Sequence, residues 1–97
     1  MSNQNNQRIH VTIEGRVQGV GFRQYVYQKA NELGIVGWVR NTSSGAVEVT
    51  AEGDQDQLSS FMNFLKQGPR SALVTQFSQE WQPSTGEFKK FAVKATL

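Results

Sequence analysis

The sequence predicts one α+β domain with a ferredoxin-like, split β-α-β fold, in which two helices cover one face of a mainly antiparallel sheet. Segments in which apolar and polar residues alternate, as in strands, are interspersed with two segments whose apolar residues recur at helical spacing. Their order is β-α-β-β-α-β, followed by a short terminal strand. The length of 97 residues suits one domain. We assign this domain to residues 8–97 and expect a disordered polar tail over residues 1–7.

A glycine-rich loop separates the first strand from the first helix. Apolar residues alternate with polar ones from Ile9 to Ile13, which is the period of a half-buried strand. The next segment, Gly15–Gly21, has three glycines in seven residues and therefore predicts a loop. The helix after it ends at Gly34, a residue that suits a left-handed C-cap. Its apolar stripe consists of Phe22, Tyr25, Val26, Ala30 and Leu33.

The middle of the chain predicts a β-hairpin. The segment Ile35–Asn41 is mostly apolar, and Ala46–Glu52 alternates. The short polar turn Thr42–Gly45 joins them.

The second helix has a capping box at its start. Asp54 is the expected N-cap and Gln57 occupies the reciprocal position. The pair Gly68-Pro69 ends the helix. Its apolar stripe consists of Leu58, Phe61, Met62 and Leu65.

Two strands complete the prediction. The first spans Leu73–Trp81, and a loop at Pro83–Gly86 follows it. Phe91 and Val93 mark a short last strand.

Composition excludes several classes of function. The chain has no cysteine and one histidine, so disulfides, thiolate metal sites and cysteine nucleophiles are excluded. We interpret the histidine, His10, as a strand residue rather than a catalyst, and Trp38 and Trp81 as packing residues. No apolar run approaches the roughly 20 residues needed to cross a membrane, and no signal peptide is visible. We expect a cytoplasmic monomer without a membrane partner.

The segment Gln18–Arg23 is the first candidate site. Its glycines lead directly into a helix, whose first backbone N–H groups lack intrahelical partners and favour an anion. The guanidinium of Arg23 could fold over the same point and contact two phosphate oxygens. A tight turn followed by a solvated arginine explains the same residues equally well. The loop matches neither a Walker A motif nor a dinucleotide-binding motif.

The second candidate is Asn41, which ends a strand beside a turn. Asparagine at such a position usually bonds to the local backbone. The residue type alone therefore favours a structural role.

Two long motifs carry a resemblance to a known family. The segment Gly15–Arg23 resembles the first acylphosphatase signature, and Gly37–Asn41 followed by Gly45–Val49 resembles the second. Gly53 and Gly68–Ala72 are similar to bacterial members, and the likeness extends over residues 9 to 94. The turn departs from the usual pattern, with Ser before Gly45 in place of Asp or Asn, and residues 76–89 are individual to this chain.

The resemblance implies hydrolysis of an acyl phosphate to a carboxylate and inorganic phosphate. It implies that Arg23 binds the phosphoryl group and that Asn41 orients the attacking water. It also implies a phosphate cradle built from backbone amides. We expect no metal or cofactor, because the chain has no Cys and one His and neither motif has paired carboxylates. We expect inorganic phosphate or sulfate to compete with the substrate, because such a cradle suits the anion and not the acyl group. The implied cradle residues are Gln18, Gly19, Val20, Gly21, Phe22 and Arg23.

Two other functions compete with this one. RNA-binding sheets carry aromatic residues on their central strands, but residues 46–50 include none, so we expect no nucleic-acid partner. Acylphosphatase-like domains also occur inside a larger hydrogenase-maturation protein, where a non-catalytic or carbamoyl-transfer role is the alternative. One domain with both Arg23 and Asn41 favours a free enzyme.

Overall fold

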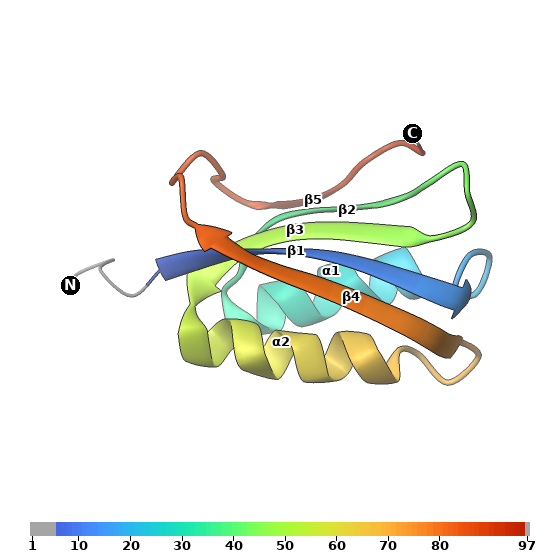
Figure 1. The fold of residues 1–97 in the computed structure, drawn as a ribbon. Helices are drawn as coiled ribbons and strands as arrows, with labels where there is room; N and C mark the ends of the chain where they lie inside the picture. The colour runs from blue at the N-terminus through green and yellow to red at the C-terminus, as the bar shows by residue number, and fades with distance from the viewer. Residues whose placement is uncertain (1–5, 97) are drawn as a thin grey trace.

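The structure, a computed structural model, describes residues 6–96 and has the predicted α+β architecture (Figure 1). The five strands form one sheet in the order β4-β1-β3-β2-β5, and both helices cover the same face. Among the hydrogen-bonded strand pairs of the described residues, only β2 and β5 are parallel. The ferredoxin-like prediction is confirmed. The elements are β1 (Asn6–Arg16), α1 (Phe22–Leu33), β2 (Val36–Asn41), β3 (Val47–Asp54), α2 (Gln55–Gln67), β4 (Leu73–Pro83) and β5 (Phe91–Val93).

The first strand begins earlier than its apolar pattern indicates. Asn6 and Gln7, which we expected in the tail, lie in β1 and pair with Asp54 and Gly53 of β3. Backbone hydrogen bonding extends the strand past the point where apolar alternation stops. Residues 1–5 of the expected tail lie outside the described residues.

The core lies between the helices and one face of the sheet. The inward residues of β1 and β3 are almost completely buried, as are the predicted helical stripes except Tyr25 and Leu33, which are partly buried. Neither helix in residues 6–96 is long and apolar enough to span a bilayer. The strand residues of this core are Ile9, Val11, Ile13, Val47, Val49 and Ala51.

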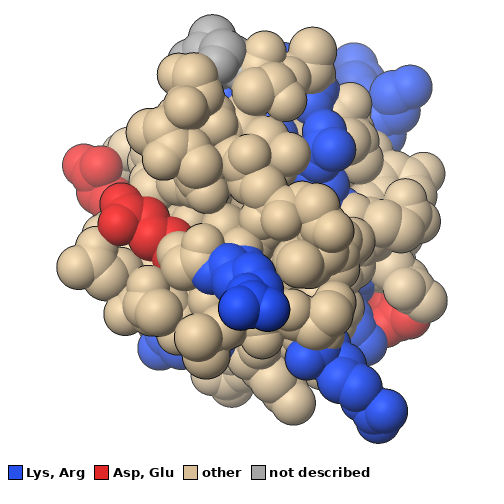
Figure 2. All heavy atoms as spheres, turned by 90° about the vertical axis from the view of Figure 1, so that its right-hand side faces the viewer, with Lys and Arg blue, Asp and Glu red and all other residues tan. Residues whose placement is uncertain are grey.

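The strands β1 and β2 end at the same edge of the sheet. Val47 of β3 pairs with Ile13 of β1 on one side and with Asn41 of β2 on the other. The glycine-rich loop and the hairpin turn therefore leave the sheet side by side (Figure 1). Figure 2 looks onto this end of the molecule, where a Lys or Arg side chain stands near the middle and Asp and Glu lie toward the sides.

Both helices begin and end as the sequence predicts, but they are capped differently. Asp54 and Gln57 form the full capping box of α2, with bonds of 2.7 and 2.9 Å. The side chain of Gln57 also donates to the Leu33 carbonyl at the end of α1. The N-cap of α1 is Gly21, which has no side chain to satisfy the first N–H groups.

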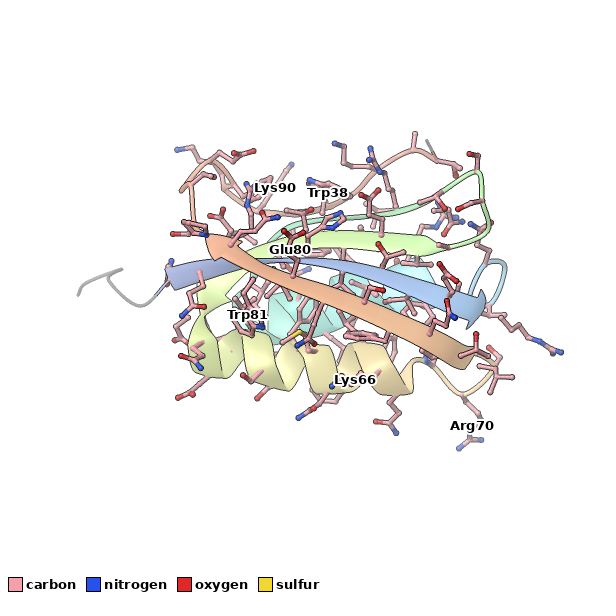
Figure 3. The ribbon with its side chains drawn as sticks, viewed as in Figure 1. Trp38, Lys66, Arg70, Glu80, Trp81 and Lys90 are labelled. Carbon is pink, nitrogen blue, oxygen red and sulfur yellow. The ribbon has the colours of Figure 1, made fainter. Side chains whose placement is uncertain are left out.

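The two tryptophans lie on opposite sides of the sheet (Figure 3). Trp81 lies on the helix side, where it remains 37% exposed. Trp38 lies on the face without helices, and the cations of Arg40 and Lys94 stand 4.6 and 4.8 Å from its ring. The apolar sequence of β2 did not indicate that Trp38 packs against charged side chains on the open face of the sheet.

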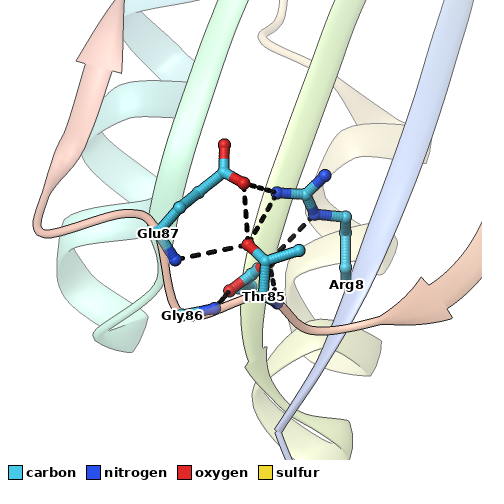
Figure 4. Close-up of polar contacts among 5 residues, drawn as sticks. Arg8, Thr85, Gly86 and Glu87 are labelled. Atoms are coloured by element: carbon cyan, nitrogen blue, oxygen red, sulfur yellow. Dashed lines mark hydrogen bonds and ion pairs between the residues drawn. The ribbon is translucent and has the colours of Figure 1, made fainter.

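A buried carboxylate fastens the β4–β5 connection onto this open face (Figure 4). Glu52 is 3% exposed and accepts hydrogen bonds from Arg8 Nε and from the backbone N–H groups of Thr85 and Gly86, at 2.9 to 3.0 Å. Arg8 Nη2 also lies 3.1 Å from a carboxylate oxygen of Glu87. Burial alone would raise the pKa of Glu52, but these donors outweigh burial and lower it.

The lowered pKa of Glu52 makes the stability of the fold depend on pH. A carboxylate whose pKa is lower in the folded state stabilises the protein above its unfolded pKa, and this contribution is lost as pH falls through the folded value. We expect Glu52→Gln to lower the free energy of unfolding at pH 7 by about 2 kcal/mol, the scale of hydrogen bonds to a charged group. As pH falls from 7 to about 3, below the unfolded pKa, the variant should lose less stability than the wild type.

Urea unfolding of both proteins at the two pH values measures this. The control is Glu80→Gln, because Glu80 is exposed and has no ion pair with another described residue. Its free energy of unfolding should change by less than about 0.5 kcal/mol. Equal pH dependence in wild type and Glu52→Gln would contradict the prediction.

Candidate active site

A cavity of about 300 Å³ opens at the edge where β1 and β2 end. Its walls combine the glycine-rich loop, the first turn of α1, the last residue of β2 and the end of β5. The lining residues are Val17, Gly19, Gly21, Phe22, Arg23, Gln24, Asn41 and Val93.

The loop at this cavity has backbone N–H groups without a backbone partner among the described residues. Gly19 and Gly21 have φ angles of 74° and 80°, a region that residues with a Cβ rarely adopt. A Cβ built at either glycine would meet no atom within 4 Å, so the backbone angle and not space requires glycine. The N–H groups of Gly19, Val20 and Gly21 bond to no other described backbone carbonyl. They are left available to an anion.

The first turn of α1 adds positive charge to this loop. It contains no acidic residue, so the helix N-terminus is not neutralised locally. Arg23 lies in this turn, is half-buried and makes no ion pair with another described residue. The cavity therefore combines a helix N-terminus with a guanidinium that is not committed to a carboxylate.

Asn41 contributes a buried acceptor. Its side chain is 8% exposed, and its Oδ1 has no hydrogen-bond partner among the described residues. The turn is closed by Thr42, whose Oγ1 accepts from the Ala46 N–H at 3.1 Å. Asn41 therefore does not serve as the turn cap that its residue type favours. A buried acceptor without a partner is costly, and a donor such as water relieves that cost.

The structure brings together most of the predicted site, with two exceptions. Arg23, Asn41, Gly19, Gly21 and Phe22 line one cavity. Gln18 and Val20 are not among its lining residues. The Gln18 side chain donates to the Thr42 and Ala46 carbonyls, and the Val20 carbonyl accepts from Ser71.

Sequence reasoning missed three lining residues. Val17 and Gln24 directly flank the predicted cradle Gln18–Arg23, so their proximity in sequence could have indicated them. Val93 could not be found in this way, because it reaches the cavity only through the parallel pairing of β5 with β2. Residues 6–96 contain no group of three or more His, Cys, Asp or Glu side chains that could hold a metal ion.

The fold and this cavity define a small α+β domain with an anion site at a helix N-terminus, and comparisons with known proteins specify its family. The acylphosphatase family model matches residues 9–93. The chain therefore belongs to the acylphosphatase family, enzymes that hydrolyse acyl phosphates (EC 3.6.1.7). The family and the class of enzyme predicted from the two sequence motifs are confirmed.

Individual relatives support the assignment. An acylphosphatase of Methylococcus capsulatus is 45% identical over 86 residues, which cover 89% of this chain and 94% of that protein. The crystal structure of acylphosphatase from Bacillus subtilis superposes with a TM-score of 0.88 at 35% identity, covering 91% of this chain and 98% of that one. Full-length HypF, in a phosphate- and nucleotide-bound form, contains a similar region with a TM-score of 0.85 at 28% identity; the match covers 94% of this chain and 12% of HypF.

The geometry of the cavity predicts that simple tetrahedral anions bind without an acyl group. We expect inorganic phosphate and sulfate to inhibit competitively, because unpaired N–H groups and a guanidinium at one cavity suit the oxygens of a tetrahedral anion and need no acyl group. Steady-state inhibition of benzoyl phosphate hydrolysis measures this. A purely noncompetitive pattern, or no inhibition at tens of millimolar, would show that the anion binds elsewhere or not at all.

Proposed function

We propose that this chain hydrolyses the carboxyl-phosphate bond of acyl phosphates with Arg23 and the loop amides holding the phosphoryl group and Asn41 orienting the attacking water. The main support is the joint presence of Arg23 and Asn41 in one cavity, with a buried, unpaired Oδ1 on Asn41. The two side chains come from different elements, α1 and β2, that meet only in the folded protein.

The phosphoryl group is bound by charge and by directed donors. The N–H groups from Gly19 onward contact its equatorial oxygens, and the planar guanidinium of Arg23 donates two further hydrogen bonds. Negative charge spreads over those oxygens in the transition state. Donors fixed in advance by the backbone stabilise that charge without rearranging during the reaction.

Water is positioned by the side chain of Asn41. Its Oδ1 accepts a hydrogen bond from the water and thereby turns a lone pair of the water oxygen toward phosphorus. Attack in line with the departing carboxylate forms the new P–O bond as the acyl P–O bond breaks. Positioning of this kind supplies a large part of the rate enhancement in such a transfer.

The proton of the water goes to the substrate. Among the lining residues in the described part of the chain, Arg23 is the only titratable side chain, and an arginine does not act as a base at neutral pH. The phosphoryl oxygens are the remaining acceptors. The leaving carboxylate is a weak base and departs without a general acid. The products are a carboxylate and inorganic phosphate.

Substitution of Arg23 tests the bidentate contact. We expect Arg23→Lys to lower kcat/KM almost as much as Arg23→Ala, because an ammonium cannot reproduce two parallel donors. Both kcat and KM for benzoyl phosphate should change. The matched control is Arg16→Lys, an exposed arginine outside the cavity, which should keep its activity. An Arg23→Lys enzyme with most of the wild-type kcat/KM would show that charge alone is sufficient.

Substitution of Asn41 separates catalysis from stability. We expect Asn41→Ala to lower kcat by about 10²-fold, the scale of a misplaced reacting group, with little change in the inhibition constant of phosphate. Because Oδ1 has no partner in the fold, the urea midpoint should stay the same or rise. Asn63→Ala on the exposed side of α2 is the control. A kcat close to that of the wild type would remove Asn41 from the reaction.

A further inference from the structure

The side chain of Gln18 joins the phosphate-binding loop to the hairpin that follows Asn41. Its Nε2 donates to the Thr42 carbonyl at 2.8 Å and to the Ala46 carbonyl at 2.9 Å. Gln18 is half-buried and lies next to Gly19, which lines the cavity. Thr42 directly follows Asn41. The side-chain amide of Gln18 therefore connects the glycine-rich loop, next to Gly19, with the hairpin turn, next to Asn41.

The hairpin turn does not need Gln18 to close. The Thr42 carbonyl already accepts from the Gly45 N–H at 3.1 Å, and the Ala46 carbonyl accepts from the Thr42 N–H at 2.9 Å. The Ala46 carbonyl also accepts from Thr42 Oγ1 at 3.4 Å, and the Gln18 amide is a further donor to both carbonyls. The two bonds from Gln18 thus add a link between segments rather than complete the turn.

We propose that Gln18 is a positioning residue that sets the phosphate-binding loop relative to Asn41, and hence the phosphorus atom relative to the attacking water. The inference rests on the roles proposed above for Arg23 and Asn41. The phosphate contacts lie on one continuous segment, from Gly19 to Arg23, whereas the water contact lies on β2. Loss of the link leaves each half intact and changes only their alignment.

Apart from those of Gln18, no side-chain hydrogen bond between described residues joins the loop to the hairpin turn. No hydrogen bond from a described residue holds the Oδ1 of Asn41, so the placement of this atom follows the backbone of the hairpin. The loop has a second tether, from Ser71 Oγ to the Val20 carbonyl at 3.1 Å. That tether runs from the connection between α2 and β4 and does not involve the hairpin. Ser71 is therefore a matched control for a loop tether that does not set Asn41.

The first experiment compares Gln18→Met with Ser71→Ala. Methionine is an unbranched side chain of similar length without a donor. For Gln18→Met we expect kcat for benzoyl phosphate to fall at least tenfold, because displacement of about 1 Å can cost up to 10²-fold. The inhibition constant of phosphate should change less than about threefold, since the phosphate contacts remain on their own segment. Ser71→Ala should change kcat less than about threefold.

A second variant tests the hydrogen bonds within one folded protein. In Gln18→Glu an ionised carboxylate faces two carbonyl oxygens, which raises the pKa of this carboxyl above its reference value of about 4.3. Once protonated, the carboxyl donates one hydrogen bond again. The ratio of its kcat to that of the wild type should therefore rise as pH falls from about 7 to about 5, whereas the ratio for Gln18→Met should stay constant.

A double-mutant cycle distinguishes this inference from the proposed function. If Gln18 acts through Asn41, the variant carrying Gln18→Met and Asn41→Ala should have the kcat of Asn41→Ala alone. Multiplicative losses would overturn the inference and leave the role of Asn41 intact. A normal kcat in Asn41→Ala alone would overturn that role instead. The inference also fails if Gln18→Met keeps the wild-type kcat, or if phosphate affinity falls as much as kcat.

Discussion

The position of β3 between β1 and β2 is the constraint on which the site depends. Because β3 is antiparallel to both neighbours, β1 and β2 run in the same direction and end at one edge of the sheet. Val47, which is completely buried, pairs with Ile13 and with Asn41. The ends of β1 and β2 therefore lie at the same position along β3. The loop proposed to bind the anion and the side chain proposed to orient water can then be neighbours, although a helix separates them in sequence.

Two buried polar side chains, Glu52 and Asn41, differ in whether other residues of the fold satisfy their hydrogen bonds. Glu52 is buried with an arginine and three donors from the β4–β5 connection, so its carboxylate accepts four hydrogen bonds. Asn41 is also buried, yet its Oδ1 has no partner among the described residues. The first arrangement stabilises the fold, and the second leaves a group whose partner must come from outside. Unsatisfied polar groups at the cavity are consistent with a site completed by substrate and water.

Short-range patterns predicted most of the fold. Alternation and helical spacing located the helices and strands, and the capping box of Asp54 and Gln57 was visible in sequence because its contacts are local. The limits of β1 were not, since Asn6 and Gln7 are held by pairing with β3 rather than by apolar burial. The placement of Arg23 and Asn41 was available through the resemblance of two motifs, not through residue chemistry. Chemistry alone favoured a turn residue at Asn41.

Contacts between distant segments explain what sequence could not supply. Nothing in the first motif indicates that the side chain of Gln18 points at the hairpin instead of the phosphate, because its acceptors are backbone carbonyls at Thr42 and Ala46. Backbone carbonyls exist at every position, so residue type carries no trace of such a contact. Residue type likewise carries no trace of a contact that the loop makes through its backbone N–H groups. A site built largely from main-chain donors suits this reaction, since a carboxylate leaving group needs little acid catalysis and phosphoryl transfer depends mainly on position and charge. Such a site requires rigid strands and two glycines with positive φ more than it requires a set of titratable side chains, and a chain of 97 residues can provide it.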